Sequence, residues 1–208
     1  MILIGQYDSP FVRRVGIALT LYAMTFEHRP WSVFGDADRL QAVNPLMRVP
    51  TLVLDDGDIL TDSATIIDYL DRVAPKDKVL FPRHEPARHR ALKVAALACG
   101  LADKAVSLFY ERRLHATVSP VWQARCLSQI AATVAVLEAD RAAQHAPWWF
   151  GQKPGHADIA VACALGFACA ALPGDLALAA TPHLQAHCDQ LEASAAFQSI
   201  YQPFVAPA

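Results

Sequence analysis

The start of the chain combines a short apolar run with a strong helix start, and this combination limits the possible folds more than any other feature. Met1–Ile4 is entirely apolar, and Ser9-Pro10 follows shortly afterwards. Serine can cap a helix, and proline suits the first helical position because its missing N–H is not needed there. Apolar side chains then recur at helical spacing as far as Tyr22. The pattern predicts a strand over 1–4 and a helix over 9–22, the first elements of an α/β layer.

The rest of the first 75 residues continues to alternate between strand-like and helix-like stretches. Asp55-Asp56-Gly57-Asp58 lies between two apolar runs, and Asp-Gly readily forms a tight hairpin turn. Asp62-Ser63 can cap a further helix directly after the second run. The remaining expected elements are a strand at 26–31, a helix at 36–43, strands at 49–54 and 59–61, and the helix that begins at 62–63. Their order predicts a small α/β domain over 1–75 with a hairpin at the edge of its sheet.

A proline-containing segment separates this first part from a helical second part. Residues 76–86 lack periodicity, contain prolines at 82 and 86, and are predicted to form a linker. Beyond them, apolar and charged residues recur at helical spacing with abundant alanine, and no stretch resembles a strand. Helices are expected at 87–116, 120–145, 155–171, 182–193 and 196–201. The sequence therefore predicts an all-helical domain over 87–208.

Composition and charge exclude several classes of function. The chain has 208 residues, enough for two small domains, and its net charge of -2 does not favour nucleic acid or an acidic membrane as a partner. No apolar stretch reaches the length of a membrane span, and no signal peptide is visible. The 5 cysteines and 8 histidines lack metal-ligand spacing, so we expect free thiols in a reducing cytoplasm and no metal site.

Four short motifs, in their order and spacing, resemble the cytosolic glutathione S-transferase superfamily over essentially the whole chain. The motifs are Ser9-Pro10-Phe11-Val12-Arg13-Arg14-Val15, Asn44-Pro45-Leu46-Met47-Arg48-Val49-Pro50-Thr51-Leu52, Leu60-Thr61-Asp62-Ser63-Ala64-Thr65-Ile66 and Gly155-His156-Ala157-Asp158-Ile159-Ala160. The first motif looks most like the serine-type branch, which includes theta, zeta and many bacterial members. The resemblance implies an α/β thioredoxin-like N-terminal domain that binds glutathione, followed by an all-α C-terminal domain that supplies most of the second-substrate pocket.

The resemblance implies that Ser9 is catalytic and donates a hydrogen bond to the sulfur of bound glutathione. A free thiol has a pKa near ~8.5, so lowering it by about two units requires roughly 2.7 kcal/mol of preferential thiolate stabilisation. A hydroxyl donor at a helix N-terminus can supply an amount of this order. Two alternatives stay open, because Ser9 could act only as a helix cap and Tyr7 could supply the activating hydroxyl instead. The omega and glutaredoxin-like branches of the family carry Cys-Pro-Phe where this chain has Ser9-Pro10-Phe11, and serine there argues against disulfide exchange, which needs a protein thiol.

The same resemblance implies further contacts with glutathione. In the family, the residue before a cis-proline pairs with the cysteinyl backbone, and Val49-Pro50 matches this position. Asp62-Ser63 matches the pair that binds the γ-glutamyl end, where a carboxylate suits the ammonium group and a hydroxyl at a helix N-terminus suits the α-carboxylate. The predicted glutathione-binding residues are Phe11, Arg14, Arg48, Val49, Pro50, Asp62 and Ser63.

Two of the arginine assignments have competitors in the sequence. Arg14 matches a family arginine near the active site, although a solvated surface arginine would fit equally, and Arg13 is the weaker candidate. Arg48 could reach the glycyl carboxylate of glutathione, with Arg39 as a less favoured alternative. The family often has glycine and lysine before the Val-Pro pair, where this chain has Met47 and Arg48, so the contact with the glycyl end is the least defined.

Gly155 and Asp158 match a family capping box that serves folding rather than catalysis. Gly155 replaces the usual hydroxyl residue, so the reciprocal side-chain bond is lost, although glycine is still a tolerated cap. Asp158 is expected to support the loop at 151–155, and both residues are predicted to be structural.

The second-substrate pocket is less well defined, because an aromatic residue at helical spacing belongs to a core more often than to a pocket. The candidate residues follow the first helix, precede the second, or lie near the middle of the helical domain. They are Phe11, Phe34, Phe109, Tyr110, Arg113 and Trp122.

The leading interpretation is a glutathione transferase that stabilises the glutathione thiolate for attack on a hydrophobic electrophile, by conjugation or a related peroxidase, isomerase or dehalogenase step. The alternative is a non-catalytic relative that binds a ligand or a protein partner. A zeta-type isomerase is less favoured, because Pro10 and Phe11 stand where that branch has its second Ser and its Cys. The resemblance also implies glutathione as co-substrate, a homodimer and no metal.

Overall fold

The computed structural model describes residues 1–176 and 180–206. The chain divides into two compact units. The first consists of Met1–Leu80 together with the C-terminal segment that begins at Ser194, and the second consists of Phe81–Ala193. Within the described residues, no helix combines the length and the apolar character that crossing a membrane would require.

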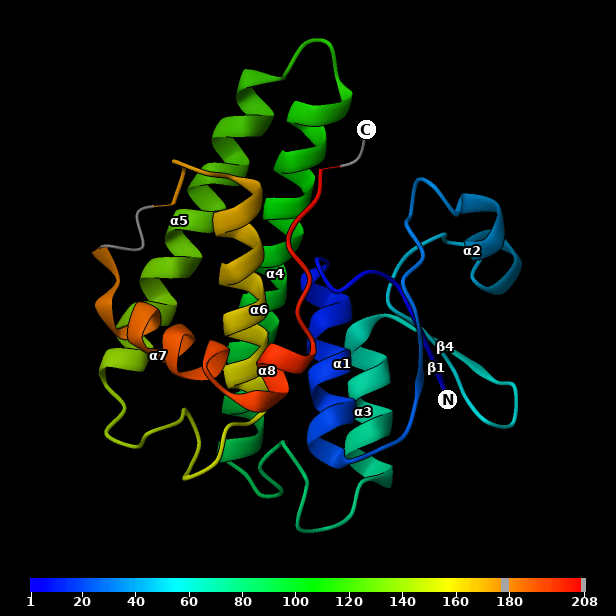
Figure 1. The fold of residues 1–208 in the computed structure, drawn as a ribbon. Coiled ribbons are helices and arrows are strands. Elements are labelled where there is room, and N and C mark those ends of the chain that lie inside the picture. The colour runs from blue at the N-terminus through cyan, green and yellow to red at the C-terminus, as the bar shows by residue number, and fades with distance from the viewer. Residues whose placement is uncertain (177–179, 207–208) are drawn as a thin grey trace. The chain divides into compact units, whose positions relative to one another are not determined.

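The first unit is built on a four-stranded mixed sheet in the order β2-β1-β3-β4, of which Figure 1 labels β1 and β4. Its strands are β1 (Ile2–Ile4), β2 (Glu27–Arg29), β3 (Thr51–Val53) and β4 (Ile59–Thr61). Strand β1 is parallel to β2 and antiparallel to β3, so Leu3 lies opposite both His28 and Leu52. The predicted hairpin joins β3 to the edge strand β4, and the Leu54 N–H closes it by donating to the Asp58 carbonyl oxygen at 2.8 Å.

Helix α1 is buried along most of its length, because α3 and α8 both pack against it. The helices of this unit are α1 (Pro10–Tyr22), α2 (Ala37–Val43), α3 (Ser63–Val73) and α8 (Ala195–Ser199). Two arginines, Arg13 and Arg14, are among the buried residues of α1. At the end of the same helix, the Tyr22 hydroxyl donates to the Asp71 carboxylate of α3 at 2.7 Å. This buried bond holds the two helices together.

The second unit is a bundle of helices (Figure 1). Its helices with defined bounds are α4 (Ala87–Leu114), α5 (Pro120–Ala142), α6 (His156–Ala171) and α7 (Pro182–Glu192). Helix α6 packs against α4 and α7, while α5 packs against the same two helices. A helix that is apolar on all sides must be buried on all sides, and residues 157–165 of α6 are indeed buried without interruption.

The structure confirms the predicted fold class, and it contains a helix or strand at each position where the sequence predicts one. The ends shift by a few residues, mainly because the strands predicted at 26–31 and 49–54 narrow to β2 and β3. One domain assignment differs from the sequence interpretation. Residues 194–206 were expected in the helical domain over 87–208, but they group with the first unit. The physical reason is that Arg13 of α1 binds the backbone of this segment.

Candidate functional site

Ser9 stands at the point where a tight turn passes into α1. The Ser9 N–H donates to the Gln6 carbonyl oxygen at 3.2 Å, which closes the turn, and Pro10 then occupies the first helical position. The Ser9 hydroxyl oxygen accepts a long hydrogen bond of 3.4 Å from the Val12 N–H. Because this bond uses only an acceptor site, the hydroxyl proton of Ser9 can still be donated to a ligand. The residue therefore caps the helix and can serve an anion at the same time.

The side chain of Tyr7 lies along α1 rather than at its N-terminus. Its ring stacks on His28, with centroids 3.8 Å apart, and a Cβ added at Gly16 would lie 3.0 Å from its Cε1 atom. Gly16 is about two helical turns, or ~10 Å, beyond Ser9. Burial raises the pKa of Tyr7 to about 12. Of the two hydroxyls left open by the sequence, the geometry favours Ser9.

The Val49–Pro50 pair packs against the end of β1 and the first turn of α1. The peptide bond between the two residues is cis, as the family resemblance implies. A Cβ added at Gly5 would lie 2.8 Å from the Val49 Cβ and 2.5 Å from the Val12 Cγ2, so only glycine allows this close approach, at a φ of +128°. The cis-proline loop and the N-terminus of α1 are therefore neighbours.

Asn44 organises the loop that carries this pair, although the sequence interpretation did not include it among the site residues. Its side chain is buried, and its amide donates to the Arg48 carbonyl oxygen and to the Thr51 hydroxyl, each at 3.0 Å. Its side-chain oxygen accepts from the Leu46 N–H at 3.0 Å. In the sequence, Asn44-Pro45 directly follows the helix expected at 36–43. The pair therefore indicates where that helix ends, but it does not indicate that Asn44 shapes the loop.

Asp62 and Ser63 form the start of α3. Asp62 has a φ of +70° and a ψ of 130°, a conformation that non-glycine residues rarely adopt and that is found most often where a site requires it. Its carboxylate accepts from the Ala64 N–H at 2.6 Å, which caps the helix and leaves further lone pairs for a cation. Asp62 is exposed, whereas Ser63 is buried. The carboxylate can thus meet a ligand from solvent.

The two neighbouring arginines of α1 reach different partners. Arg14, which is 3% exposed, donates from Nη1 to the Ser63 hydroxyl oxygen at 3.4 Å. Arg13 donates from Nε to the Ile200 carbonyl oxygen at 2.9 Å. Arg14 is therefore a buried support of Ser63 and not a solvated surface residue.

The remaining candidates of the first unit are more exposed. Arg48 is exposed at the tip of the loop before Val49, and Phe34 is 46% exposed in the segment before α2. Phe11 is partly exposed in the first turn of α1. Arg39, the less favoured alternative to Arg48, forms a local ion pair with Asp36 at 3.1 Å.

The other candidate pocket residues belong to the second unit. The rings of Phe109 and Tyr110, both on α4, have centroids 5.7 Å apart. Arg113 lies in the last turn of α4. Trp122, in the first turn of α5, lies under the Lys104 ammonium, with 5.7 Å between the nitrogen and the ring centroid. Their role in a pocket stays a prediction.

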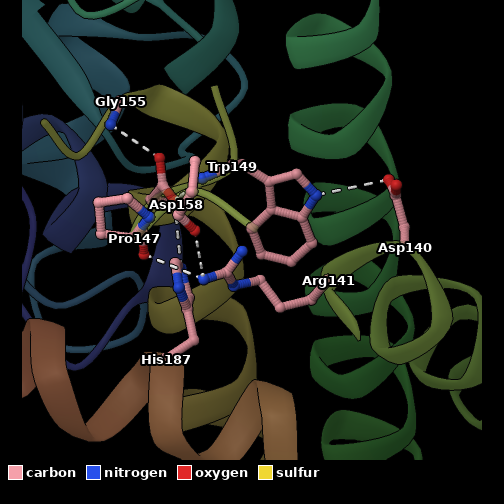
Figure 2. A network of polar contacts seen from close by, with 8 residues as sticks. Asp140, Arg141, Pro147, Trp149, Gly155, Asp158 and His187 are labelled. Atoms are coloured by element: carbon pink, nitrogen blue, oxygen red, sulfur yellow. Dashed lines mark hydrogen bonds and ion pairs between the residues drawn. The ribbon is translucent and has the colours of Figure 1, made fainter. Parts of the chain in front are cut away.

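Asp158 forms half of a capping box and a second bond that the sequence did not indicate (Figure 2). Its carboxylate accepts from the Gly155 N–H at 2.8 Å, and Gly155 has no side chain to return the bond. Its other oxygen accepts from the Trp149 N–H at 2.9 Å. Asp158 therefore holds Gly155 at the end of the loop at 151–155, as expected, and also Trp149, which precedes that loop. His187 of α7 covers the carboxylate, with Nε2 at 3.3 Å from Oδ1.

Two family models match the chain. The model described as the N-terminal domain of glutathione S-transferase matches residues 3–78, and the model described as its C-terminal domain matches residues 120–190. Among curated proteins, the maleylacetoacetate isomerase of Pseudomonas aeruginosa is 32% identical over 76% of this chain and 77% of its own length. The uncharacterised GST-like protein YibF of Escherichia coli is 36% identical, but the match spans only half of each protein.

Solved structures of glutathione S-transferases are also similar to this chain over nearly its whole length. A glutathione S-transferase from Methylobacterium radiotolerans, in complex with glutathione sulfonate, has a TM-score of 0.88 at 28% identity and covers 100% of this chain and 98% of its own. A glutathione S-transferase from Methylobacillus flagellatus, solved with glutathione bound, has a TM-score of 0.87 at 25% identity and covers 96% of this chain and 98% of its own.

Proposed function

This chain belongs to the glutathione S-transferase family, and on that premise we propose that it binds glutathione in its first unit and activates the thiol with Ser9 for attack on an apolar electrophile. The observation that carries the proposal is that residues of α1 lie next to two of the predicted anchors, Val49 and Ser63. Val12 and Val49 both pack against Gly5, and Arg14 donates a hydrogen bond to Ser63. Ser9 caps the N-terminus of the same helix, three residues before Val12.

In the proposed complex, glutathione lies along these anchors as an extended tripeptide. The backbone of Val49 pairs with the cysteinyl residue like an added strand. The Asp62 carboxylate binds the γ-glutamyl ammonium group, while the Ser63 hydroxyl and the N-terminus of α3 bind the α-carboxylate. Because the Ser63 oxygen accepts from Arg14, its own proton is directed away from Arg14 and can be donated to the ligand. Arg48 is the proposed partner of the glycyl carboxylate.

Ser9 then acts on the sulfur. A hydrogen bond to a charged group contributes about 1.5–3 kcal/mol, and a helix N-terminus adds about 0.3–1 kcal/mol for a nearby anion. Together these amounts match the roughly 2.7 kcal/mol that lowers a thiol pKa by about two units. The thiolate forms a carbon–sulfur bond with the electrophile, whose leaving group departs or whose electron pair takes up a proton from water.

A specific comparison favours isomerisation as the second candidate reaction, because the Pseudomonas aeruginosa relative is named maleylacetoacetate isomerase. The same thiolate would add to a conjugated double bond, the resulting single bond would rotate, and the sulfur would leave again. No atom is gained or lost in that sequence. Pro10 and Phe11 in place of the Ser and Cys of the zeta-type branch argue for conjugation instead.

Replacing Ser9 by alanine tests the proposed function. We expect Ser9→Ala to lower kcat/KM about tenfold to hundredfold, since one charge-assisted hydrogen bond is lost, and to raise the pKa of the bound glutathione thiol. Ser119→Ala is the matched control, because Ser119-Pro120 caps α5 with a comparable bond of 3.3 Å to the Trp122 N–H. Both variants lose a helix cap, but only the first should lose thiolate stabilisation.

The assay uses thiolate absorbance against pH and a panel of electrophiles, hydroperoxides and maleylacetoacetate. An unchanged thiol pKa in Ser9→Ala would rule out the assigned role of Ser9. No turnover on any substrate, together with no retention on immobilised glutathione, would favour a non-catalytic binding protein.

We also propose a homodimer, as the family resemblance implies. Light scattering at micromolar concentration should give twice the mass of 22.6 kDa for one chain. A single-chain mass would contradict the dimer.

A further inference from the structure

The C-terminal segment is attached to α1 by a buried arginine. Arg13 donates to the carbonyl oxygens of Ile200 at 2.9 Å and Phe197 at 3.4 Å. Its guanidinium also lies over the rings of Phe197 and Tyr201, at 5.2 and 5.6 Å from their centroids. Carbonyl oxygens and aromatic faces together satisfy the buried cation. The arrangement therefore holds the end of α8 and the start of the following segment against α1.

Beyond this attachment, the segment is bound to the two central residues of the turn that precedes Ser9. The Tyr7 N–H donates to the side-chain oxygen of Gln202 at 3.1 Å. Burial raises the pKa of the Asp8 carboxyl, and the backbone of Val205 in the same segment lowers it in part. Both positions between Gln6 and Ser9 therefore meet the end of the chain, Tyr7 through a hydrogen bond and Asp8 through the nearby backbone of Val205.

Gly16 provides the close packing that this arrangement requires. A Cβ at Gly16 would lie 2.8 Å from the Ile200 Cγ2 atom and 3.0 Å from the Tyr7 Cε1 atom. Neither distance leaves room for a methyl group, so the absence of a side chain lets Ile200 and Tyr7 meet the same spot on α1. The attachment by Arg13 and the packing at Gly16 both bring the segment to the turn.

We propose that residues 200–206, here named the C-terminal strap, hold the turn before Ser9 in its productive shape, and that Gln202 is a positioning residue for the reaction. The proposal rests on the proposed function of Ser9. Gln202 acts through the turn and needs no contact with glutathione. A turn whose central N–H lacks this partner would sample other shapes, and the Ser9 hydroxyl would then meet the sulfur less often at the right distance.

The neutral amide of Gln202 is part of the inference. A carboxylate at this position could accept the same bond from Tyr7, but it would place a negative charge near the thiolate. Like charges disfavour the ionised form of each other, so the pKa of the glutathione thiol would rise. Gln202→Glu therefore keeps the positioning bond and changes the charge, whereas Gln202→Leu removes the bond and leaves the charge unchanged.

The experiment compares these two variants with Gln190→Leu, which makes the same change at an exposed position of α7. Thiolate absorbance gives the thiol pKa, steady-state kinetics give kcat and the glutathione KM across pH, and thermal unfolding confirms that each variant is folded. We expect Gln202→Leu to lower kcat about threefold to tenfold at every pH, the factor that one hydrogen bond supplies, with little change in KM. We expect Gln202→Glu to lose activity near neutral pH and to regain the wild-type kcat above its raised thiol pKa.

Three outcomes would contradict the proposed role of the C-terminal strap. The first is a folded Gln202→Leu whose kcat matches that of Gln190→Leu. The second is a Gln202→Leu that changes only KM, and the third is a Gln202→Glu that loses kcat at all pH values as Gln202→Leu does. Failure of the proposed function would look different, because Ser9→Ala would then leave the thiol pKa unchanged. If Ser9→Ala raises the thiol pKa as expected but the Gln202 variants have no effect on kcat, only the proposed role of the C-terminal strap is contradicted.

Discussion

Removing the Asp158 carboxylate should destabilise the second unit more than any surface substitution. The side chain is 1% exposed, and its two oxygens accept from the backbone N–H groups of Trp149 at 2.9 Å and Gly155 at 2.8 Å (Figure 2). In Asp158→Ala both N–H groups lose their partner, at a buried position for Trp149 and a part-buried one for Gly155. The backbone bonds lower the pKa of Asp158, but desolvation by burial outweighs them and raises it overall.

The magnitude follows from the two orphaned donors. A buried donor without a partner costs about 1–3 kcal/mol, so the buried Trp149 N–H and the part-buried Gly155 N–H together cost at most about 6 kcal/mol. Part of this cost is offset, because the variant no longer buries a carboxylate at a raised pKa. We therefore expect a loss of about 3 kcal/mol in the free energy of unfolding. For a chain of this size that corresponds to a fall in Tm of about 6–12 °C.

Thermal unfolding at neutral pH, followed by circular dichroism, measures the effect. Asp189→Ala on the exposed face of α7 is the matched control and should change stability by less than ~0.5 kcal/mol. Below its lower Tm, Asp158→Ala should keep the wild-type kcat, since the residue supports folding and not the reaction. A Tm equal to that of the control would refute the reasoning, and a lost kcat in a folded variant would contradict the structural assignment.

Two further predictions concern buried basic side chains. Burial, and then the Arg141 charge, lower the pKa of His187 from 6.5 to about 4, so as pH falls from 6.5 the unfolded chain takes up a proton before the folded chain does. The stability that His187 contributes is complete above pH 6.5 and is lost towards pH 4, by up to about 3 kcal/mol; urea unfolding should show this slope in wild type and a flatter one in His187→Gln. Arg14→Met should weaken glutathione binding in calorimetry about threefold to tenfold, but it should add nothing in a Ser63→Ala background, and additive losses would show that Arg14 acts elsewhere.

The fold could be predicted from sequence because its determinants are local. The Ser-Pro pair at Ser9, the Asp-Gly turn at Gly57 and the apolar spacing of each helix lie within a few residues of the elements that they define. In the structure, Gly57 has a φ of +89° in the β3–β4 turn, a conformation that favours glycine. Strand lengths were predicted less well, because pairing with neighbours decides where a strand ends.

The bonds that shape the loops could not be predicted, because residues distant in sequence make them. The capping motif indicated that Asp158 holds Gly155, but its bond to Trp149 depends on how the preceding loop returns to α6. Asn44 likewise resembled an ordinary helix end, while its amide in fact joins Arg48 to Thr51. A polar residue followed by proline indicates a turn, but it does not reveal which carbonyl oxygens come within reach.

The adjacent arginines of α1 show how one motif can serve two parts of the first unit. Successive residues of a helix point about 100° apart, so Arg13 and Arg14 must face different partners. Local spacing predicts that divergence, but the partners lie far along the chain, at Ile200 for Arg13 and at Ser63 for Arg14. Helix α1, which Ser9 caps, thus carries one buried cation toward the proposed glutathione site and another toward the C-terminal strap. In the proposed mechanism the C-terminal strap holds the turn before Ser9 while Arg14 supports Ser63, so neither arginine needs to touch the substrate.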